Sequence, residues 1–354
     1  MARELLAMCS IQRSAESPRQ SWLLGILAVS LLLAILVATG VGAVHLPLHL
    51  LAGSLIGQDS LSADQRVILF SVRIPRIIAA TMVGCALSVS GLLFQGLFRN
   101  PLADPYVVGS SGGAVLGASI GVFLLPTLTF AGFGTTALLS FAGAIGSITL
   151  VYWLAHVEGR TPVVALLLAG FTVSTILSYF SYFIEVLDHD LGTGLQVLTA
   201  WLHGTIAQPS WLQLSVVGAM LAIGMICAIP LAPRLNTLAL GEEYAAHLGV
   251  SVQQTRIAII LVGSILTAAA VALGGLISFT GLIIPHILRM VLGPDHVRLL
   301  PATALGGALF LLVADTIART AIAPAELPVG VLTALIGGPF FLFLLRKTKQ
   351  TVLS

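Results

Sequence analysis

Charged residues are scarce in this chain of 354 residues. Only 8% of the residues are charged, with 16 basic and 14 acidic side chains, whereas about a quarter of a soluble domain is charged. Together with a mean hydropathy of +1.05, this scarcity places the chain in lipid and excludes a soluble enzyme. It also excludes nucleic acid as a partner, because so few cations cannot form a basic binding surface.

The sequence also lacks the residues that nucleotide, metal and disulfide sites need. Its only lysines, Lys347 and Lys349, lie near the C-terminus. A nucleotide-binding P-loop has a lysine after its last glycine, so the glycine-rich stretch 109–113 is not a Walker A motif. The three cysteines are scattered without metal-type spacing, which predicts neither a disulfide nor a metal site: Cys9, Cys85 and Cys227.

Long apolar runs fill most of the chain. They are continuous over about 20 residues rather than alternating, which is typical of membrane-spanning helices and not of barrel strands. The sequence therefore predicts an all-α, polytopic membrane protein with about ten transmembrane helices. The segment 191–206 is too polar to span and predicts a short helix. The predicted spans are 22–44, 66–97, 106–126, 131–155, 163–187, 210–231, 254–274, 277–293, 299–321 and 329–346.

The distribution of arginine and lysine sets the expected orientation. With ten spans, 12 of the 16 basic residues fall on the side that holds both termini. Because cytoplasmic loops carry an excess of positive charge, both termini are expected in the cytoplasm. This divides the chain into a cytoplasmic segment 1–21, a ten-helix domain 22–346 and a cytoplasmic tail 347–354.

The largest polar stretch on the expected cytoplasmic side runs from Arg234 to Arg256. Its centre has helix-compatible spacing, with Glu242 and Glu243 in the first turn, where negative charge favours a helix N-terminus. Gly249 is placed to end that helix. A short helix displayed between two spans suits docking of a soluble partner, and an ordinary solvated loop is the alternative.

Ionisable residues are nearly absent from the predicted spans. Ion-coupled transporters usually keep such residues near the middle of the bilayer, and a membrane-embedded enzyme needs a polar cluster there. The sequence therefore favours a transporter that takes its energy from another subunit. A secondary transporter or channel without an ATPase remains the competing class.

Three long segments resemble the FecCD family, the permeases of type II ABC importers for iron chelates, heme and vitamin B12. The resemblance extends from about residue 66 to the C-terminus. The matching segments are 73–118 (RIPRIIAATMVGCALSVSGLLFQGLFRNPLADPYVVGSSGGAVLGA), 238–249 (LALGEEYAAHLG) and the run that begins GLISFTGLIIPHILRMVLGPDH at 275.

The resemblance implies a permease domain with no covalent chemistry and no cofactor of its own. It implies a homodimer in the bacterial inner membrane, two cytoplasmic ATPase subunits that bind ATP, and a periplasmic binding protein that delivers the substrate. Heme is the first choice of substrate, followed by a ferric siderophore and vitamin B12. No set of axial ligands for heme iron can be read from the sequence, although His189 and His203 lie near the expected outer face.

The resemblance also implies roles for particular residues. Arg73, Arg76 and Arg319 match positions that dock the binding protein, and Asn100 and Leu102 match a cytoplasmic gate, with a second gate layer expected from the loop 160–165. The segment 238–250 matches the ATPase coupling segment. Its expected contact residues are Leu240, Gly241, Glu242, Glu243, Tyr244, Ala245, Ala246, Leu248 and Gly249.

Overall fold

The computed structural model describes residues 18–42, 62–126, 129–130, 132–157, 161–187, 191–206, 208–323 and 325–352. Within these residues the chain is helical apart from turns and one short antiparallel pair, in which Thr129 faces Gly134. The elements are α2 (Pro18–Gly40), α4 (Ala63–Val67), the π-helix η1 (Ile68–Arg73), α5 (Ile74–Phe98), the 3-10 helix η2 (Pro105–Val108), α6 (Ser110–Ser119), the π-helix η3 (Ile120–Leu124), β1 (Thr129–Phe130), β2 (Phe133–Gly134), α7 (Thr135–Ala155), α8 (Val163–Leu187), α9 (Leu191–Leu202), α10 (Trp211–Ala228), α11 (Leu231–Ala239), α12 (Glu242–His247), α13 (Val252–Gly274), α14 (Thr280–Leu292), α15 (His296–Ala318) and α16 (Val329–Val352).

Every predicted span contains helical residues, and the predicted short helix within 191–206 is α9, which ends at Leu202. Seven helices in the described residues are long and apolar enough to cross a membrane. Three further apolar segments are shorter, 110–124, 280–292 and 329–343. The polytopic helical class is confirmed, whereas the count of ten spans and the cytoplasmic side stay predictions.

Two predicted spans are broken rather than continuous. The span 106–126 contains the 3-10 helix η2, then α6 and a π-helical turn, and Gly109 between η2 and α6 has a φ of 93°. The span 277–293 begins with irregular backbone, and α14 starts only after Phe279, whose φ is 68°. Non-helical backbone in a membrane protein is tolerated where other protein segments cover it or where it lines a cavity.

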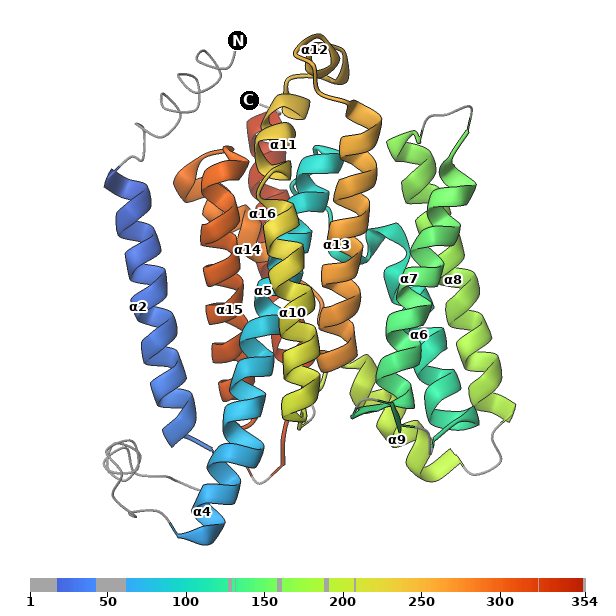
Figure 1. Ribbon diagram of the computed structural model, residues 1–354, viewed down its shortest axis with the longest axis vertical. Coiled ribbons are helices and arrows are strands. Elements are labelled where there is room, and N and C mark those ends of the chain that lie inside the picture. The colour runs from blue at the N-terminus through green and yellow to red at the C-terminus, as the bar shows by residue number, and fades with distance from the viewer. Residues whose placement is uncertain are drawn as a thin grey trace.

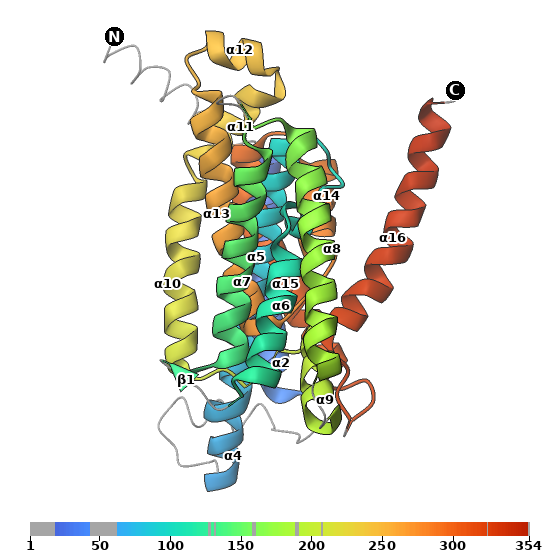
Figure 2. The same cartoon turned by 90° about the vertical axis from the view of Figure 1, so that its right-hand side faces the viewer.

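The outer boundaries of the predicted domain also differ from the helices. Helix α2 begins at Pro18, inside the segment predicted as a polar terminus, and α16 continues past residue 346 to Val352. The start of α2, the end of α16 and helix α12 lie at one end of the molecule, and α4 and α9 lie at the other (Figure 1). Helix α16 leans away from the remaining helices (Figure 2).

Helix α5 is the central helix, and glycine lets its neighbours approach it closely. A Cβ added at Gly84 would collide with the backbone of Gly307 in α15, and one at Gly91 with the backbone of Gly281 in α14. Ser90 Oγ donates to the Gly263 carbonyl of α13 at 2.7 Å. In lipid, burial of apolar surface gives little driving force for helix association, so helices associate through close packing at small residues.

The Gly91–Gly281 contact predicts a specific sensitivity to substitution. Gly91→Ala should lower the free energy of unfolding by about 1–3 kcal/mol, because α5 and α14 must separate to admit the methyl group. Thermal unfolding of the purified protein in detergent measures the change. Gly146→Ala in α7 is the matched control, since nothing lies within 4 Å of its added Cβ. Equal melting temperatures for the two variants would contradict the close crossing.

Candidate functional site

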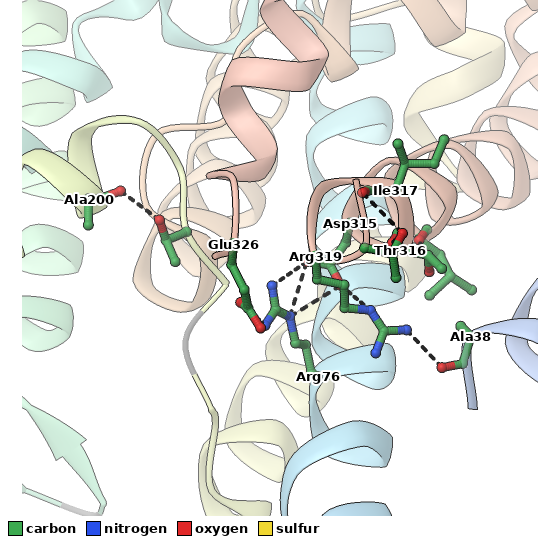
Figure 3. A network of polar contacts seen from close by, with 11 residues as sticks. Ala38, Arg76, Ala200, Asp315, Thr316, Ile317, Arg319 and Glu326 are labelled. Atoms are coloured by element: carbon green, nitrogen blue, oxygen red, sulfur yellow. Dashed lines mark hydrogen bonds and ion pairs between the residues drawn. The ribbon is translucent and has the colours of Figure 1, made fainter. Parts of the chain in front are cut away.

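The end of the molecule opposite α12 is held together by a buried group of charges (Figure 3). The Asp315 carboxylate of α15 is fully buried and accepts from Arg76 Nη2 of α5 at 3.0 Å. Arg76 Nη1 also donates to the Glu326 carboxylate at 2.6 Å. A buried carboxylate is costly unless it is paired and hydrogen-bonded, so this network fixes α5, α15 and the α15–α16 loop relative to one another.

Two further arginines attach helix α2 to this network. Arg319 Nη2 donates to the Ala38 carbonyl at 2.7 Å, and Arg73 Nη1 donates to the Thr39 carbonyl at 2.8 Å. Positive charge is favourable at a helix C-terminus, where the last carbonyls have no partners within the helix. The two side chains, expected on an exposed docking surface, are therefore buried by contacts inside the protein.

The predicted gate residues lie on a tight turn after α5. Arg99 adopts a left-handed conformation, with a φ of 49°, and ends the helix. Asn100 Oδ1 then accepts the Leu102 N–H at 3.0 Å, which closes a side-chain turn around Pro101. Asn100 is exposed and Leu102 is half-buried. The turn holds both residues in place, and their gating role stays a prediction.

A pocket of about 430 Å³ opens beside the segment that follows this turn. Its polar lining includes Asp104, Ser111 on α6, Ser174 on α8 and Ser278 in the α13–α14 loop. Asp104 caps η2 by accepting the Tyr106 N–H at 2.9 Å. Burial raises the pKa of the Asp104 carboxyl from 3.8 to about 6, although the hydrogen bond from Tyr106 acts in the opposite direction.

A second pocket, of about 380 Å³, shares Leu276 and Ser278 with the first. Its other walls come from the end of α9 and the start of α16, including His203 and Leu335. The two pockets are therefore adjacent, with Leu276 and Ser278 in both walls, and we call them together the α8–α16 groove, with Asp104 in one pocket and His203 in the other. Sequence analysis missed it, because its polar residues come from five separate segments.

Helix α12 forms the short helix expected within 238–250. It begins at Glu242, with both glutamates in its first turn, and ends before Gly249, whose φ is 82°. The exposed fractions of Tyr244 and Leu248 are 69% and 66%, whereas Ala245 is fully buried. Ala245 thus seats α12 on the bundle and is not part of the exposed face on which it was expected. Leu240, Glu243 and Ala246 are exposed.

Comparison with known proteins identifies the family of this chain. The chain matches the FecCD transport family over residues 30–347. It belongs to the FecCD family. As a FecCD protein it is a transport component, the polytopic membrane permease of a type II ABC importer, and the ATPase activity of such importers lies in partner subunits. This sets aside a secondary transporter without an ATPase.

Characterised relatives of this FecCD permease differ in the substrates that their names give. It is 38% identical to the hemin transport system permease HmuU of Yersinia pestis over 92% of this chain and 96% of that protein. It is 43% identical to the cobalamin import permease BtuC of Halobacterium salinarum, over 81% and 76% of the two chains. An inward-facing structure of a metal-chelate type ABC transporter matches 93% of this chain and 99% of that chain, with a TM-score of 0.78 and 32% identity.

The thiols and the acidic residues of the FecCD permease add no further site to the groove. Cys85 and Cys227 are free thiols, and Cys9 lies outside the described residues. Across the part of the chain that the structure describes, no three His, Cys, Asp or Glu side chains are grouped as metal ligands. Asp104 is the acidic residue among those that line the two pockets.

Asp104 predicts a pH-dependent stability. Because its pKa is raised to about 6, the folded protein binds more protons than the unfolded chain between about pH 4 and 6, and this contribution to stability is lost as the pH rises. Asp104→Asn keeps an oxygen to cap η2 and removes the charge, so it should gain about 2 kcal/mol relative to the natural protein at pH 7.5 and almost nothing at pH 4. Melting temperatures at both pH values measure this, and a difference independent of pH would contradict the raised pKa.

Proposed function

We propose that this permease works as a homodimer in the bacterial inner membrane and imports heme, with the α8–α16 groove as its path. The adjacency of the two pockets supports this proposal most directly. Their combined size is in the range of small-molecule sites, which are mostly apolar with a few placed polar groups. Apolar side chains in the walls suit a flat hydrophobic macrocycle, among them Leu167, Phe171, Leu202, Val331 and Leu335.

His203 favours heme among the substrates named for the relatives. Its Nδ1 lies 2.7 Å from the Thr199 carbonyl, and because a carbonyl only accepts, Nδ1 must carry the proton. With the single proton of a neutral imidazole on Nδ1, Nε2 has a free lone pair, and an imidazole nitrogen is a common ligand of heme iron. His203 is exposed beside apolar walls, so it can meet iron during passage. His189, the other candidate, lies outside the described residues.

The substrate proposal predicts a ranking of cargoes. When the permease is reconstituted in vesicles with its ATPase and its binding protein, hemin should stimulate ATP hydrolysis and enter the vesicles, whereas cobalamin and ferric citrate should do neither. His203→Ala should slow hemin entry severalfold, because it removes the imidazole, and should leave assembly with the ATPase unchanged. Cobalamin or ferric citrate as the sole stimulating cargo would overturn the choice of heme.

The partner copy is proposed to cover the faces of α8 and α16 that border the groove. Helix α8 is only 17% buried within one chain. Large apolar side chains along it are exposed, among them Leu168, Phe171, Tyr179 and Phe180. A second copy placed on this face would enclose the groove and remove these side chains from lipid.

The binding protein is proposed to dock at the end that carries the charged network. A small pocket of about 120 Å³ there is lined by Arg73, Arg76 and Arg319 together with Glu326. Within this cluster, three guanidinium groups face the two carboxylates of Asp315 and Glu326, so positive charge is in excess there. Acidic side chains of a partner would be attracted to it, mainly increasing the association rate and fixing orientation.

The cytoplasmic turn and helix α12 complete the proposal. Asn100 and Leu102 are proposed to narrow the inner end of the path. Helix α12 is proposed to enter a groove on the ATPase, with Tyr244 and Leu248 as apolar anchors and Leu240, Gly241, Glu243, Ala246 and Gly249 around them. Aromatic anchors surrounded by small residues are typical of the energetic centres of interfaces.

The docking role of α12 predicts the effect of a single bulky charge. Ala246→Arg should leave folding and membrane insertion intact, because Ala246 is exposed. It should reduce assembly with the ATPase by roughly tenfold or more, since it places an unpaired charge in a desolvated contact. Binding of the detergent-solubilised permease to the ATPase measures this loss. Ala200→Arg, at an exposed position on α9 at the opposite end, is the matched control for assembly. Full assembly of the Ala246→Arg variant would show that α12 does not dock the ATPase.

A further inference from the structure

Helix α12 is joined to the start of α8 through one buried arginine. Arg256 lies in the first turns of α13, and its side chain is buried. Its Nη2 donates to the Glu242 carboxylate of α12 at 2.6 Å. Its Nη1 donates to the Thr161 carbonyl, just before α8, at 2.7 Å. One guanidinium group therefore holds the proposed ATPase-docking helix and the turn that opens α8.

The Thr161 end of this connection is packed into the bundle. Thr161 is fully buried, and its Oγ1 lies 3.0 Å from His156 Nδ1 at the end of α7. Gln253 Nε2, one turn before Arg256 on α13, donates to the same hydroxyl at 3.2 Å. The turn that opens α8 is thus in contact with α7 and α13, and a displacement of its backbone shifts these contacts.

The Glu242 end is the exposed one. The side chain of Glu242 is 54% exposed, and α12 is a helix of six residues set between two glycines with positive φ, Gly241 and Gly249. A partner that displaces α12 would displace the Glu242 carboxylate with it. Because the contact with Arg256 is short and charge-assisted, such a displacement would either move the guanidinium group or break the pair.

We propose that Arg256 is the positioning residue that transmits movement of α12 to the α8–α16 groove. The movement passes from Glu242 through Arg256 to the Thr161 carbonyl and then along α8. Helix α8 supplies four residues to the groove wall: Leu167, Gly170, Phe171 and Ser174. Glu242, assigned from the sequence to contact with the ATPase, acts inside the permease in this mechanism. The inference rests on the proposed docking of α12.

Lysine cannot replace arginine in this role. An arginine fork directs separate N–H groups at two acceptors at fixed angles, whereas a lysine carries one compact charge on a flexible stem. Arg256→Lys should therefore keep the positive charge and lose the simultaneous contact. Glu242→Gln weakens the same connection from its exposed end, because it removes the negative charge of the acceptor. It poses little risk to folding, since the substitution is close in shape and lies on the surface.

The test uses the whole importer in vesicles and measures two quantities separately: affinity between permease and ATPase, and cargo molecules imported per ATP hydrolysed. We expect Arg256→Lys and Glu242→Gln each to lower import per ATP roughly tenfold with assembly retained. The double variant should be no worse than either single one, because both break one connection. Arg234→Lys, at an exposed arginine on α11, is the matched control and should keep the natural ratio.

The outcomes separate this proposal from the docking of α12. Normal import per ATP in assembled Arg256→Lys and Glu242→Gln importers would overturn the role of Arg256 while leaving docking intact. Independent losses that multiply in the double variant would also overturn it, since the two residues would then act separately. If Arg256→Lys fails to fold, Glu242→Gln alone decides. Failure of the natural permease to bind any ATPase would instead overturn the proposed function.

Discussion

The pairing of α5 with α15 is the contact on which the rest of the structure depends. The two helices meet through Gly84 and Gly307, and they are joined near one end by the Arg76–Asp315 ion pair. A carboxylate with no exposure would be strongly destabilising without its cation. The pair therefore sets the orientation of α5, and with it the faces of α5 that pack against α13 and α14. Arg319 attaches α2 to the same charged network.

The opposite end of the protein uses the same chemistry. Arg76 joins the fully buried Asp315 to the half-exposed Glu326, and Arg256 joins the packed Thr161 turn to the half-exposed Glu242. In the proposed mechanism, the exposed carboxylate at the α12 end is the one that the ATPase moves. The groove between α8 and α16 lies between these two ends, where movement of α8 changes its width.

The irregular segments are explained by the groove that they line. A continuous helix over 106–126 or 277–293 would pair its backbone groups within itself. The breaks at η2 and at the loop before α14 bring Asp104, Tyr106 and Ser278 to the cavity wall instead. Tyr106 OH also accepts the Ile277 N–H at 3.3 Å, so the two broken segments support each other.

The membrane class, most of the helical segments and the short helix within 238–250 could be predicted from the sequence, because length, apolarity and glycine position are local properties. The sequence also predicted Arg73, Arg76 and Arg319 among the few basic residues on one side. The burial of Arg73 and Arg319 against α2, the inward position of Ala245 and the pairing of Glu242 with Arg256 became evident from the fold alone. These facts depend on contacts between residues up to 281 positions apart in the chain, and hydropathy and spacing carry no information about such contacts.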